Sequence, residues 1–388
     1  MSHTSQLAGM DFNLSEEHKA VREAARDFAQ NDLLPGVIER DNEQKFDTDL
    51  LRKMGELGFM GMMVSPEYGG GGMDTLAYAI AIEEISKVDA SAGVIMSVNN
   101  SLVCWGLQEY GSEDQKQKYL TRLATGEVIG AFCLSEPEAG SDATSQHTIA
   151  IENQDHYLLN GTKNWITNGN SSSICLVIAQ THPEKKHKGI NTFIVEKGIE
   201  GFAVGRKEDK MGIRASDTHT LMFSDVKVPK SDRIGEDGSG FKFAMSTLNG
   251  GRVGIAAQAL GIASGAFELA LKYSKERKTF GKPISEHQAI QFKLSDMATR
   301  IEAARMLVYK AARLKDEGKD YIKAAAMAKL YASDIAMWVT TEAVQIHGGY
   351  GYVKEYHVER YMRDAKITQI YEGTSEIQKL VIARELLK

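Results

Sequence analysis

The chain has 388 residues, of which 43% are hydrophobic and 25% are charged, and its formal net charge is −6. This length exceeds what one hydrophobic core supports, so we expect two or three packed domains with room for a deep pocket. The mildly acidic balance argues against a surface for nucleic acid, and three widely spaced cysteines, Cys104, Cys133 and Cys175, argue against disulfides and structural zinc.

The N-terminus and the histidines show no targeting or metal-binding pattern. Residues 1–9 have neither the basic start and apolar centre of a signal peptide nor the arginine-rich character of a transit peptide. No stretch approaches eighteen consecutive apolar residues, and the ten histidines show no HExxH or comparable spacing. We therefore expect a cytoplasmic protein with no metal, no nucleic-acid partner and no stable membrane insertion.

Residues 10–128 are expected to form an all-helical N-terminal domain. Residues 15–18 have the composition of a helix start, and apolar residues follow at helical spacing, at Val21, Ala24, Ala25 and Phe28. Four consecutive glycines at 69–72 interrupt the helical pattern, and they predict a loop because glycine does not hold a helix.

Residues 129–235 are expected to form a central β-domain. Short apolar or β-branched runs at 174–178, 192–195 and 220–223 are separated by turn residues. The spacing of these turns is typical of a small β-sandwich or barrel. Because strands do not alternate with helices here, a doubly wound parallel sheet is disfavoured.

Residues 236–388 return to helical periodicity and predict a C-terminal four-helix bundle. Residues 322–344 are rich in alanine and nearly apolar around the whole helix, which indicates burial between neighbouring helices or subunits. The predicted fold class is therefore α+β multidomain, with helical, β and helical parts in that order.

Two common phosphate-binding motifs are missing, since no GxGxxG follows a strand and no GxxxxGK[ST] occurs. A nicotinamide-binding Rossmann enzyme is therefore disfavoured. Phosphate binding would need hydroxyls, backbone N–H groups and helix starts from other segments.

Four segments are candidates for a ligand site, and each has an ordinary structural alternative. Residues 132–142 run from a strand into a turn of small donors, or form only a β-turn. Trp165 lies two residues before Thr167 on one face of an extended strand, where it stacks on a flat ligand or fills the core. Arg277 clamps a pyrophosphate or complements a helix C-terminus, and residues 345–352 are a glycine-rich ligand loop or a plain helix cap.

The segment 370–377 is the fifth candidate. Ser375 and Gln378 form a capping-box pair that predicts a helix start near Glu376, with Ile377, Leu380 and Val381 as its buried stripe. Thr374 and Ser375 would then offer hydroxyls and N–H groups to an anion. Glu372 is either a solvated carboxylate near a helix start or a functional group beside that anion site.

Taken in this order, the segments after about Met10 resemble the acyl-CoA dehydrogenase family. Cys133-Leu134-Ser135-Glu136-x-x-Ala139-Gly140-Ser141-Asp142 is similar to the first family signature. Gln345-x-x-Gly348-Gly349-x-Gly351-Tyr352-x-x-Glu355 is similar to the second, and residues 370–375 are similar to the catalytic segment. The resemblance implies the three-domain fold already indicated by the composition, a non-covalent FAD, oxidation of acyl-CoA to trans-2-enoyl-CoA, electron transfer to an electron-transfer flavoprotein, and a homotetramer.

The resemblance makes Glu372 the general base that removes the α-proton while the β-hydrogen leaves as hydride to the flavin. Burial should then raise the pKa of Glu372 from about 4.3 towards roughly 6 to 8. The resemblance also implies that the thioester carbonyl is polarised by the backbone N–H of Glu372 and by a ribityl hydroxyl of FAD.

The resemblance also assigns the binding residues. Those that match flavin-ring contacts are Phe132, Cys133, Leu134, Ser135, Ser141, Trp165, Ile166 and Thr167. Those that match contacts to the rest of FAD, in part from a neighbouring subunit, are Arg277, Thr279, Phe280, Gln288, Gln345, Ile346, His347, Gly348, Gly349, Thr374, Ser375 and Glu376. Those that match acyl-CoA contacts are Ser141, Asn249, Gly251, Arg252, Gln258, Thr368 and Gly373.

The chain departs from the family pattern at Glu138, where glycine is usual, and at Asn249, where many relatives have aspartate. Some relatives carry the base near the position of Arg252, but the preceding glycines offer no carboxylate here. Gln258 and Thr368 match residues that close the pocket in the short-chain subgroup, so we expect a butyryl-CoA-like substrate from fatty-acid or branched-chain amino-acid catabolism. A 2-methylacyl-CoA dehydrogenase, an acyl-CoA oxidase and a non-catalytic FAD or CoA scaffold stay open as alternatives.

Overall fold

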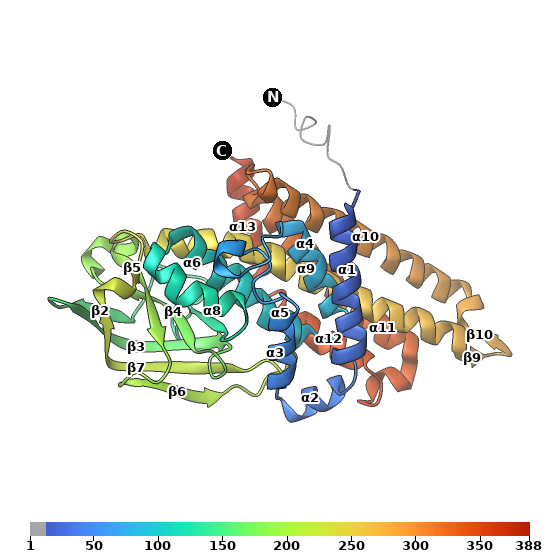
Figure 1. Cartoon of the computed structure of the whole chain (residues 1–388). Coiled ribbons are helices and arrows are strands. Elements are labelled where there is room, and N and C mark those ends of the chain that lie inside the picture. Colours follow the sequence, from blue (N-terminus) through green and yellow to red (C-terminus); the bar gives the residue numbers. More distant parts are fainter. Residues whose placement is uncertain (1–12) are drawn as a thin grey trace.

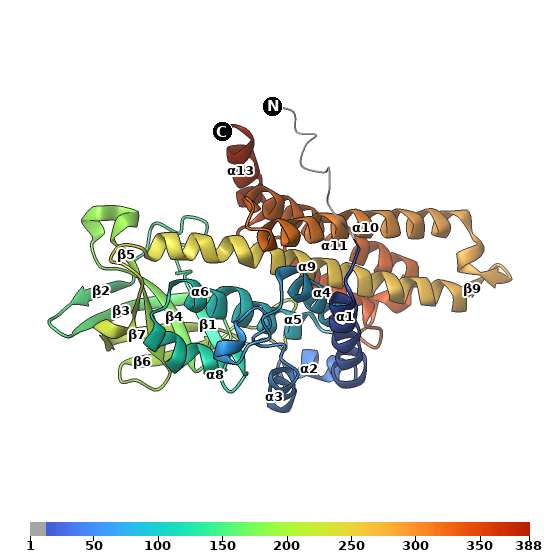
Figure 2. The same cartoon turned by 45° about the horizontal axis from the view of Figure 1, so that its top comes forward.

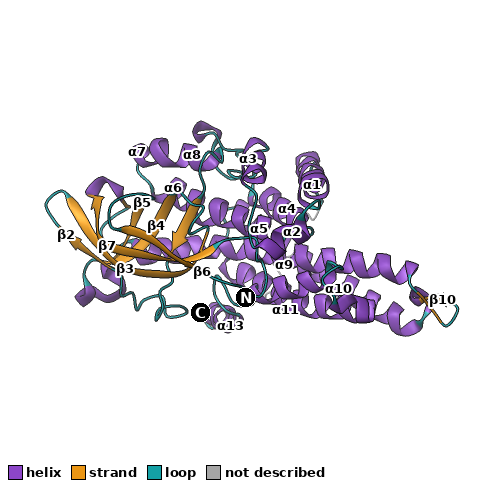
Figure 3. Ribbon diagram, turned by 90° about the horizontal axis from the view of Figure 1, so that it is seen from below, coloured by secondary structure: helices purple, strands orange, loops and turns teal. Residues whose placement is uncertain are grey.

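The computed structural model describes residues 13–388, so the expectations for residues 1–9 and for a domain start at residue 10 lie outside the described part. An eight-stranded sheet lies at one end of the molecule, a small two-stranded hairpin lies at the other end, and helices form the rest (Figures 1 and 3). The N-terminal helices lie beside the long C-terminal helices, and both helical parts contact the sheet. The order of helical, β and helical parts is the one that the sequence predicted.

Most of the N-terminal helices, namely the first, third, fourth, fifth and seventh, begin after a residue whose side chain caps them. In chain order, the N-terminal helices are α1 (Glu16–Phe28), α2 (Val37–Glu43), α3 (Thr48–Glu56), α4 (Thr75–Ser86), α5 (Ala90–Ser97), α6 (Trp105–Tyr110), α7 (Glu113–Gln115) and α8 (Thr121–Ala124). Ser15 caps α1, since its hydroxyl accepts a hydrogen bond from the backbone N–H of His18 at 3.2 Å. The predicted helix start at residues 15–18 and the loop at the four glycines are confirmed.

The central strands form one eight-stranded sheet. They are β1 (Gly130–Cys133), β2 (Ile149–Glu152), β3 (His156–Thr167), β4 (Ile174–Gln180), β5 (Ile190–Glu196), β6 (Phe202–Lys207), β7 (Thr218–Pro229) and β8 (Arg233–Ile234). Their order is β6-β7-β3-β2-β4-β5-β8, with β1 parallel to β4. The three predicted strand runs lie inside β4, β5 and β7, and the pairings are mainly antiparallel, as expected for a β-domain.

Strand β3 is irregular at its C-terminal end. The register between β3 and β7 shifts between Lys163 and Ile166, and Trp165 takes the left-handed backbone conformation with φ of 61°. The expected regular extended strand is therefore wrong at this residue. Trp165 is 61% exposed, so it is not a core residue, whereas Ile166 is buried in the sheet core.

The C-terminal domain is helical, as predicted, with α9 (Gly240–Glu276), α10 (Gln288–Asp316) and α11 (Ile322–His347) as its long helices. A small hairpin of β9 (Lys278–Thr279) and β10 (Lys282–Pro283) joins α9 to α10. Where a fourth long helix was expected, the chain forms two shorter ones, α12 (Val358–Ile367) and α13 (Ser375–Leu386). The turn between them carries Glu372.

The start of α13 differs by one residue from the prediction. Thr374, and not Ser375, is the N-cap, because its hydroxyl accepts a hydrogen bond from the backbone N–H of Ile377 at 3.3 Å. Val381 is buried as expected, but Leu380 is 65% exposed and the buried position beside it is Gln378. The predicted apolar stripe is therefore wrong at Leu380.

One hydrophobic core joins both helical domains, since α9 packs against α4, α5 and α11. Two described helical stretches, Ala90–Tyr110 and Gly240–Glu276, have the length and hydropathy of membrane-crossing helices. The most apolar parts of these stretches are 94% and 83% buried inside the protein. Both stretches therefore contribute to this internal core.

Candidate active site

Glu372 lies in a strained turn between α12 and α13. Its φ is 52°, a left-handed value that residues with a side chain rarely adopt, and Gly373 follows with φ of 95°. A Cβ on Gly373 would lie 2.6 Å from Nε2 of Gln378, so glycine is required there by space as well as by conformation. Such a turn persists only where its surroundings hold it.

Three buried side chains hold this turn. Lys329 of α11 donates from Nζ to the carbonyl oxygen of Gly373 at 2.5 Å, and Gln378 of α13 donates to the same oxygen at 2.8 Å. On the preceding residue, the Tyr371 hydroxyl donates to Oε1 of Gln258 on α9. The turn is thus fixed from three different helices.

The carboxylate of Glu372 is turned into the protein. Its Oε2 is buried and has no hydrogen-bond partner among the described residues. A Cβ on Gly251 of α9 would lie 2.2 Å from that oxygen, so this glycine leaves the space that the carboxylate occupies. Burial raises the pKa of Glu372 to about 7, although the charges of Lys329 and Arg252 oppose the rise. A solvated surface carboxylate does not fit this geometry.

Buried side chains from both helical domains surround Glu372. The Tyr78 hydroxyl of α4 hydrogen-bonds Oγ of Ser97 at 3.0 Å, and Leu102, in the π-helical segment Val98–Cys104, faces Gly251. Gln258 is fully buried and donates to the carbonyl of Ala90 at 2.8 Å. Thr368 is also fully buried, and its hydroxyl donates to Ala365 O at 2.7 Å.

Most of the predicted acyl-CoA residues lie next to Glu372 or to a residue that adjoins it. Gly251 and Gly373 adjoin Glu372, and Gln258 is bonded to the neighbouring Tyr371. Arg252 donates to Oδ1 of Asn249 at 2.7 Å, and its buried Nε has no partner within residues 13–388. Ser141 is exposed on the β-domain loop that follows β1.

The first and second flavin segments lie side by side in the β-domain. The backbone N–H of Asn164, next to Trp165, donates to Ser135 O at 2.8 Å. Beneath them, the buried Lys163 donates to Leu134 O at 3.1 Å and to Oε1 of Glu136 at 2.6 Å. Cys133 and Ile166 belong to the sheet core, so their side chains face away from any ligand on the surface. Phe132, Ser135 and Thr167 are partly exposed.

The third and fourth segments lie together at the far end of the bundle. The guanidinium of Arg277 lies 5.6 Å above the Tyr350 ring, and Thr279 hydrogen-bonds His287 at 3.2 Å, one residue before Gln288. Phe280, at the hairpin tip, is 96% exposed. His347 stacks on Tyr273 and hydrogen-bonds Ala343 O, so its ring belongs to the helix packing, and Ile346 is buried as well.

The hairpin and the sheet lie at opposite ends of the molecule (Figures 1 and 2). Helix α9 runs between these ends with 37 residues, which corresponds to about 55 Å at 1.5 Å per residue. One dinucleotide does not reach from one end to the other. The two groups of predicted FAD residues are therefore not brought together within a single chain.

Several polar atoms fit a ligand beside the turn. The buried Oγ of Ser375, Oε1 of Gln378 and Nε of Arg252 have no hydrogen-bond partner among the described residues, like Oε2 of Glu372. Buried polar atoms are normally paired, so this concentration around one turn matches a site that a polar ligand completes. No group of three or more possible metal ligands occurs in the described chain.

The sequence interpretation missed Lys329, Gln378 and Tyr371 as supports of Glu372. One signal was present: Lys329 interrupts an alanine-rich stretch that is apolar around its whole circumference. A lysine in such a helix needs a buried partner, and the partner is a carbonyl 44 residues away in the chain.

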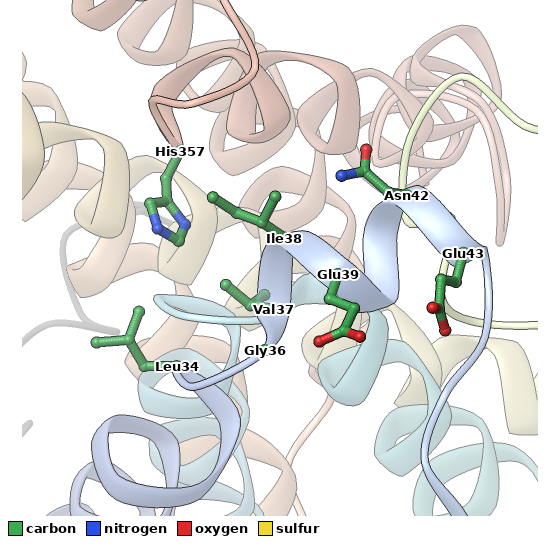
Figure 4. A pocket seen from close by; sticks show the side chains of 8 residues that line it. All are labelled: Leu34, Gly36, Val37, Ile38, Glu39, Asn42, Glu43 and His357. Carbon is green, nitrogen blue, oxygen red and sulfur yellow. The ribbon is translucent and has the colours of Figure 1, made fainter.

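Two surface hollows lie away from Glu372. The first, of about 540 Å³, is formed by α2 and His357 (Figure 4). The second, of about 490 Å³, lies beside β2 and includes His147 and His187. Neither contains a residue that the sequence assigned to a site.

Comparisons with known proteins identify the family of this chain. Three family profiles match, namely the acyl-CoA dehydrogenase N-terminal domain over residues 15–127, the middle domain over 131–226 and the C-terminal domain over 238–387. The short-chain specific acyl-CoA dehydrogenase of Clostridium acetobutylicum is 52% identical over 98% of this chain and all of its own length.

Two solved structures are similar to this chain over nearly its whole length. Butyryl-CoA dehydrogenase from Megasphaera elsdenii has a TM-score of 0.96 and 51% identity, and covers 98% of this chain and 100% of its own. A chain in the structure of the electron transferring flavoprotein of Acidaminococcus fermentans has a TM-score of 0.97 and 54% identity, with the same coverage. These matches confirm the fold and the resemblance seen in the sequence: the chain belongs to the acyl-CoA dehydrogenase family, whose members are FAD-dependent flavoprotein oxidoreductases.

Proposed function

We propose that this chain oxidises a short-chain acyl-CoA thioester, such as butyryl-CoA, to the trans-2-enoyl-CoA, with Glu372 as the general base. The observation that carries the proposal is a buried carboxylate oxygen of Glu372 that has no hydrogen-bond partner within residues 13–388, on a turn that three helices hold. Relatives with 51–52% identity over nearly the whole chain that are named as short-chain enzymes support the substrate class.

In this reaction Glu372 accepts the α-proton of the thioester, and the new carbon–carbon double bond forms as the β-hydrogen leaves with its electron pair. FAD, when bound, supplies the acceptor for that hydride. A pKa of about 7 leaves a substantial carboxylate fraction near neutral pH while keeping the group basic, which suits a general base. The buried wall around Glu372 excludes water from the proton transfer.

The short-chain preference rests on the fixed position of Gln258. Its amide is bonded on one side to Ala90 O and on the other to the Tyr371 hydroxyl, so the side chain does not swing away to admit a longer chain. Each further methylene that fits a pocket contributes about 0.8 kcal/mol, so the preference should be graded with chain length.

We further propose that FAD binds between subunits of a cytoplasmic homo-oligomer, a homotetramer by the family pattern. Support comes from the separation of the sheet residues from the Arg277 hairpin and from the full exposure of Phe280 at its tip. An electron-transfer flavoprotein is the proposed electron acceptor.

The test is an anaerobic addition of butyryl-CoA to the FAD-loaded protein and to its Glu372→Gln variant. The native protein should lose its oxidised-flavin absorbance, and the variant should keep it. Fast reduction in the variant would remove Glu372 as the base, and a kcat/KM that peaks at eight carbons or more would remove the short-chain assignment. Peroxide release in air without another acceptor would instead indicate an oxidase.

A further inference from the structure

Lys329 is a fully buried lysine, and within residues 13–388 its side chain hydrogen-bonds only the backbone carbonyl of Gly373. No carboxylate within residues 13–388 lies within 4 Å of its Nζ as an ion pair. A buried ammonium without a directly paired carboxylate is costly, and a methionine of similar length would fit the alanine-rich helix better. The position therefore indicates a role beyond packing.

The bonded carbonyl belongs to the turn that carries the base. Glu372 and Gly373 both have positive φ, and the Gly373 oxygen accepts hydrogen bonds from Lys329 and Gln378 together. The carboxylate of Glu372 on this turn lies against Gly251. Loss of one donor would leave the carbonyl held by the other alone, and would weaken the support of the strained backbone.

The charge of Lys329 also faces the base. The charged and titratable groups around Glu372 are Lys329 on α11, Arg252 on α9, Tyr78 on α4 and the adjacent Tyr371. Around Lys329 they are Glu372, Arg252 and Asp334. Arg252 already shares its guanidinium with Asn249, whereas the bond of Lys329 leads to the residue after Glu372. Lys329 is thus the cation most closely connected to the base.

We propose that Lys329 is a positioning residue for the general base, because its bond to the Gly373 carbonyl fixes the turn that aims Glu372 and its charge favours the proton-accepting carboxylate. This inference rests on the proposed function of Glu372. Burial lowers the pKa of Lys329 to about 8, so the ammonium form still predominates at neutral pH.

The sign of the pH effect follows from the removal of this charge. Without a nearby cation the carboxylate form of Glu372 is less favoured, so its pKa rises and the acidic limb of kcat/KM moves to higher pH. Lys329→Met removes both the charge and the donor. Lys329→Gln keeps a donor without the charge, and Lys329→Arg keeps the charge.

The first experiment measures kcat, KM and the pH profile for butyryl-CoA with the FAD-loaded variants. Lys329→Met should lower kcat at least tenfold with little change in KM, and should raise the acidic limb by about one pH unit. Lys329→Arg should keep the acidic limb of the pH profile at its native position. Lys329→Gln should move the limb to higher pH but retain more of kcat than Lys329→Met does. The matched control is Lys323→Met, on the same helix and partly exposed. A Lys329→Met enzyme with lower thermal stability but native kcat per bound FAD and a native limb overturns the inference.

The second experiment needs no activity and separates this inference from the proposed function. Glu372→Gln is introduced into the native and Lys329→Met backgrounds, and Tm is measured from pH 5 to pH 9. The stabilisation from Glu372→Gln should be larger in the Lys329→Met background above pH 7, because the carboxylate there has lost its cation. Equal stabilisation in both backgrounds overturns the inference. If Lys329→Met does not fold, Lys329→Gln replaces it in this cycle.

The outcomes for the two claims differ. An active Glu372→Gln enzyme refutes the proposed function, and with it the positioning role of Lys329. An inactive Glu372→Gln enzyme beside a Lys329→Met enzyme with native kcat and pH profile refutes only the role of Lys329.

Discussion

Glu372 shows how one residue can be unfavourable for folding and suited to chemistry. Its backbone lies in the left-handed region, and one carboxylate oxygen is buried without a hydrogen bond from any residue that the structure describes. Both features destabilise the folded state relative to a residue chosen for stability alone. At the scale of residues, removal of the Glu372 charge should therefore raise the stability of the fold, whereas removal of a well-paired surface charge should lower it.

Glu372→Gln should stabilise the protein at high pH. Burial raises the pKa of Glu372 from its ordinary 4.5 to about 7, so the folded state binds the proton more tightly than the unfolded state does. As pH rises from about 4.5 through about 7, ionisation lowers the stability of the native protein but not that of the variant. Tm of the variant should exceed the native value above pH 7, and the difference should vanish near pH 4.5.

The control for this prediction is Glu376→Gln, four residues away. Hydrogen bonds from its own backbone N–H and from Thr374 hold the pKa of Glu376 below its ordinary value, so this carboxylate stabilises the fold when ionised. Its substitution should lower Tm at neutral pH and have less effect in acid. The same sign in both variants would contradict the assigned burial of Glu372.

Gly251→Ala should displace the base without disturbing the helix. The new Cβ would lie 2.2 Å from Oε2 of Glu372 and 2.8 Å from Cδ2 of Leu102, so the carboxylate has to move. A displacement of about 1 Å is enough to lower kcat roughly a hundredfold. The measurement is kcat of the FAD-loaded enzyme with butyryl-CoA.

Gly250→Ala is the matched control for that substitution. It lies on the same helix one residue earlier, and its Cβ would meet only the flexible end of Lys315 at 3.5 Å and the Tyr321 hydroxyl at 4.0 Å. Alanine also favours a helix over glycine by about 1 kcal/mol, so both variants should fold. Equal activity of the two variants would show that the space beside Gly251 is not needed.

At the scale of elements, the sequence predicted those features that depend on interactions between residues close together in the chain. The cap at Ser15, the loop of glycines and the strand runs of the β-domain depend on residues close together in the chain. The bulge at Trp165 was not predicted, because it arises from pairing with β7, about 50 residues later. The supports of Glu372 were missed for the same reason, since Lys329 and Gln258 come from distant helices.

The start of α13 offers a direct test of one such difference. The structure makes Thr374 the N-cap, so Thr374→Ala should cost about 1 kcal/mol in the free energy of unfolding. Ser375→Ala should cost less, because the Ser375 hydroxyl has no hydrogen-bond partner among the described residues. Urea unfolding of the two variants measures both values. A larger loss for Ser375→Ala would favour the cap that the sequence predicted.

At the scale of the whole molecule, the helical domains carry the proposed base, and the sheet carries part of the predicted flavin contacts. The base lies where α4, α9, α11 and the α12–α13 turn converge, and the β1 loop and Trp165 lie on the sheet. Helix α9 carries Gly251 and Arg252 in its first half and ends at the Arg277 hairpin. One chain therefore presents a sheet surface at one end, a separate basic, aromatic hairpin at the other (Figure 2), and the base among the helices.

Subunit complementation tests whether the hairpin serves a neighbouring subunit. Arg277→Ala and Glu372→Gln should each be inactive alone, the first through weak FAD retention and the second through loss of the base. In a mixed oligomer, a site that combines Glu372 of one subunit with Arg277 of the other is intact. Unfolding and refolding the two variants together with FAD should thus restore about one quarter of native activity for random pairing in a symmetric interface. If the Arg277 hairpin served its own subunit, every site would carry one of the two defects, and the mixture would stay as inactive as its parts.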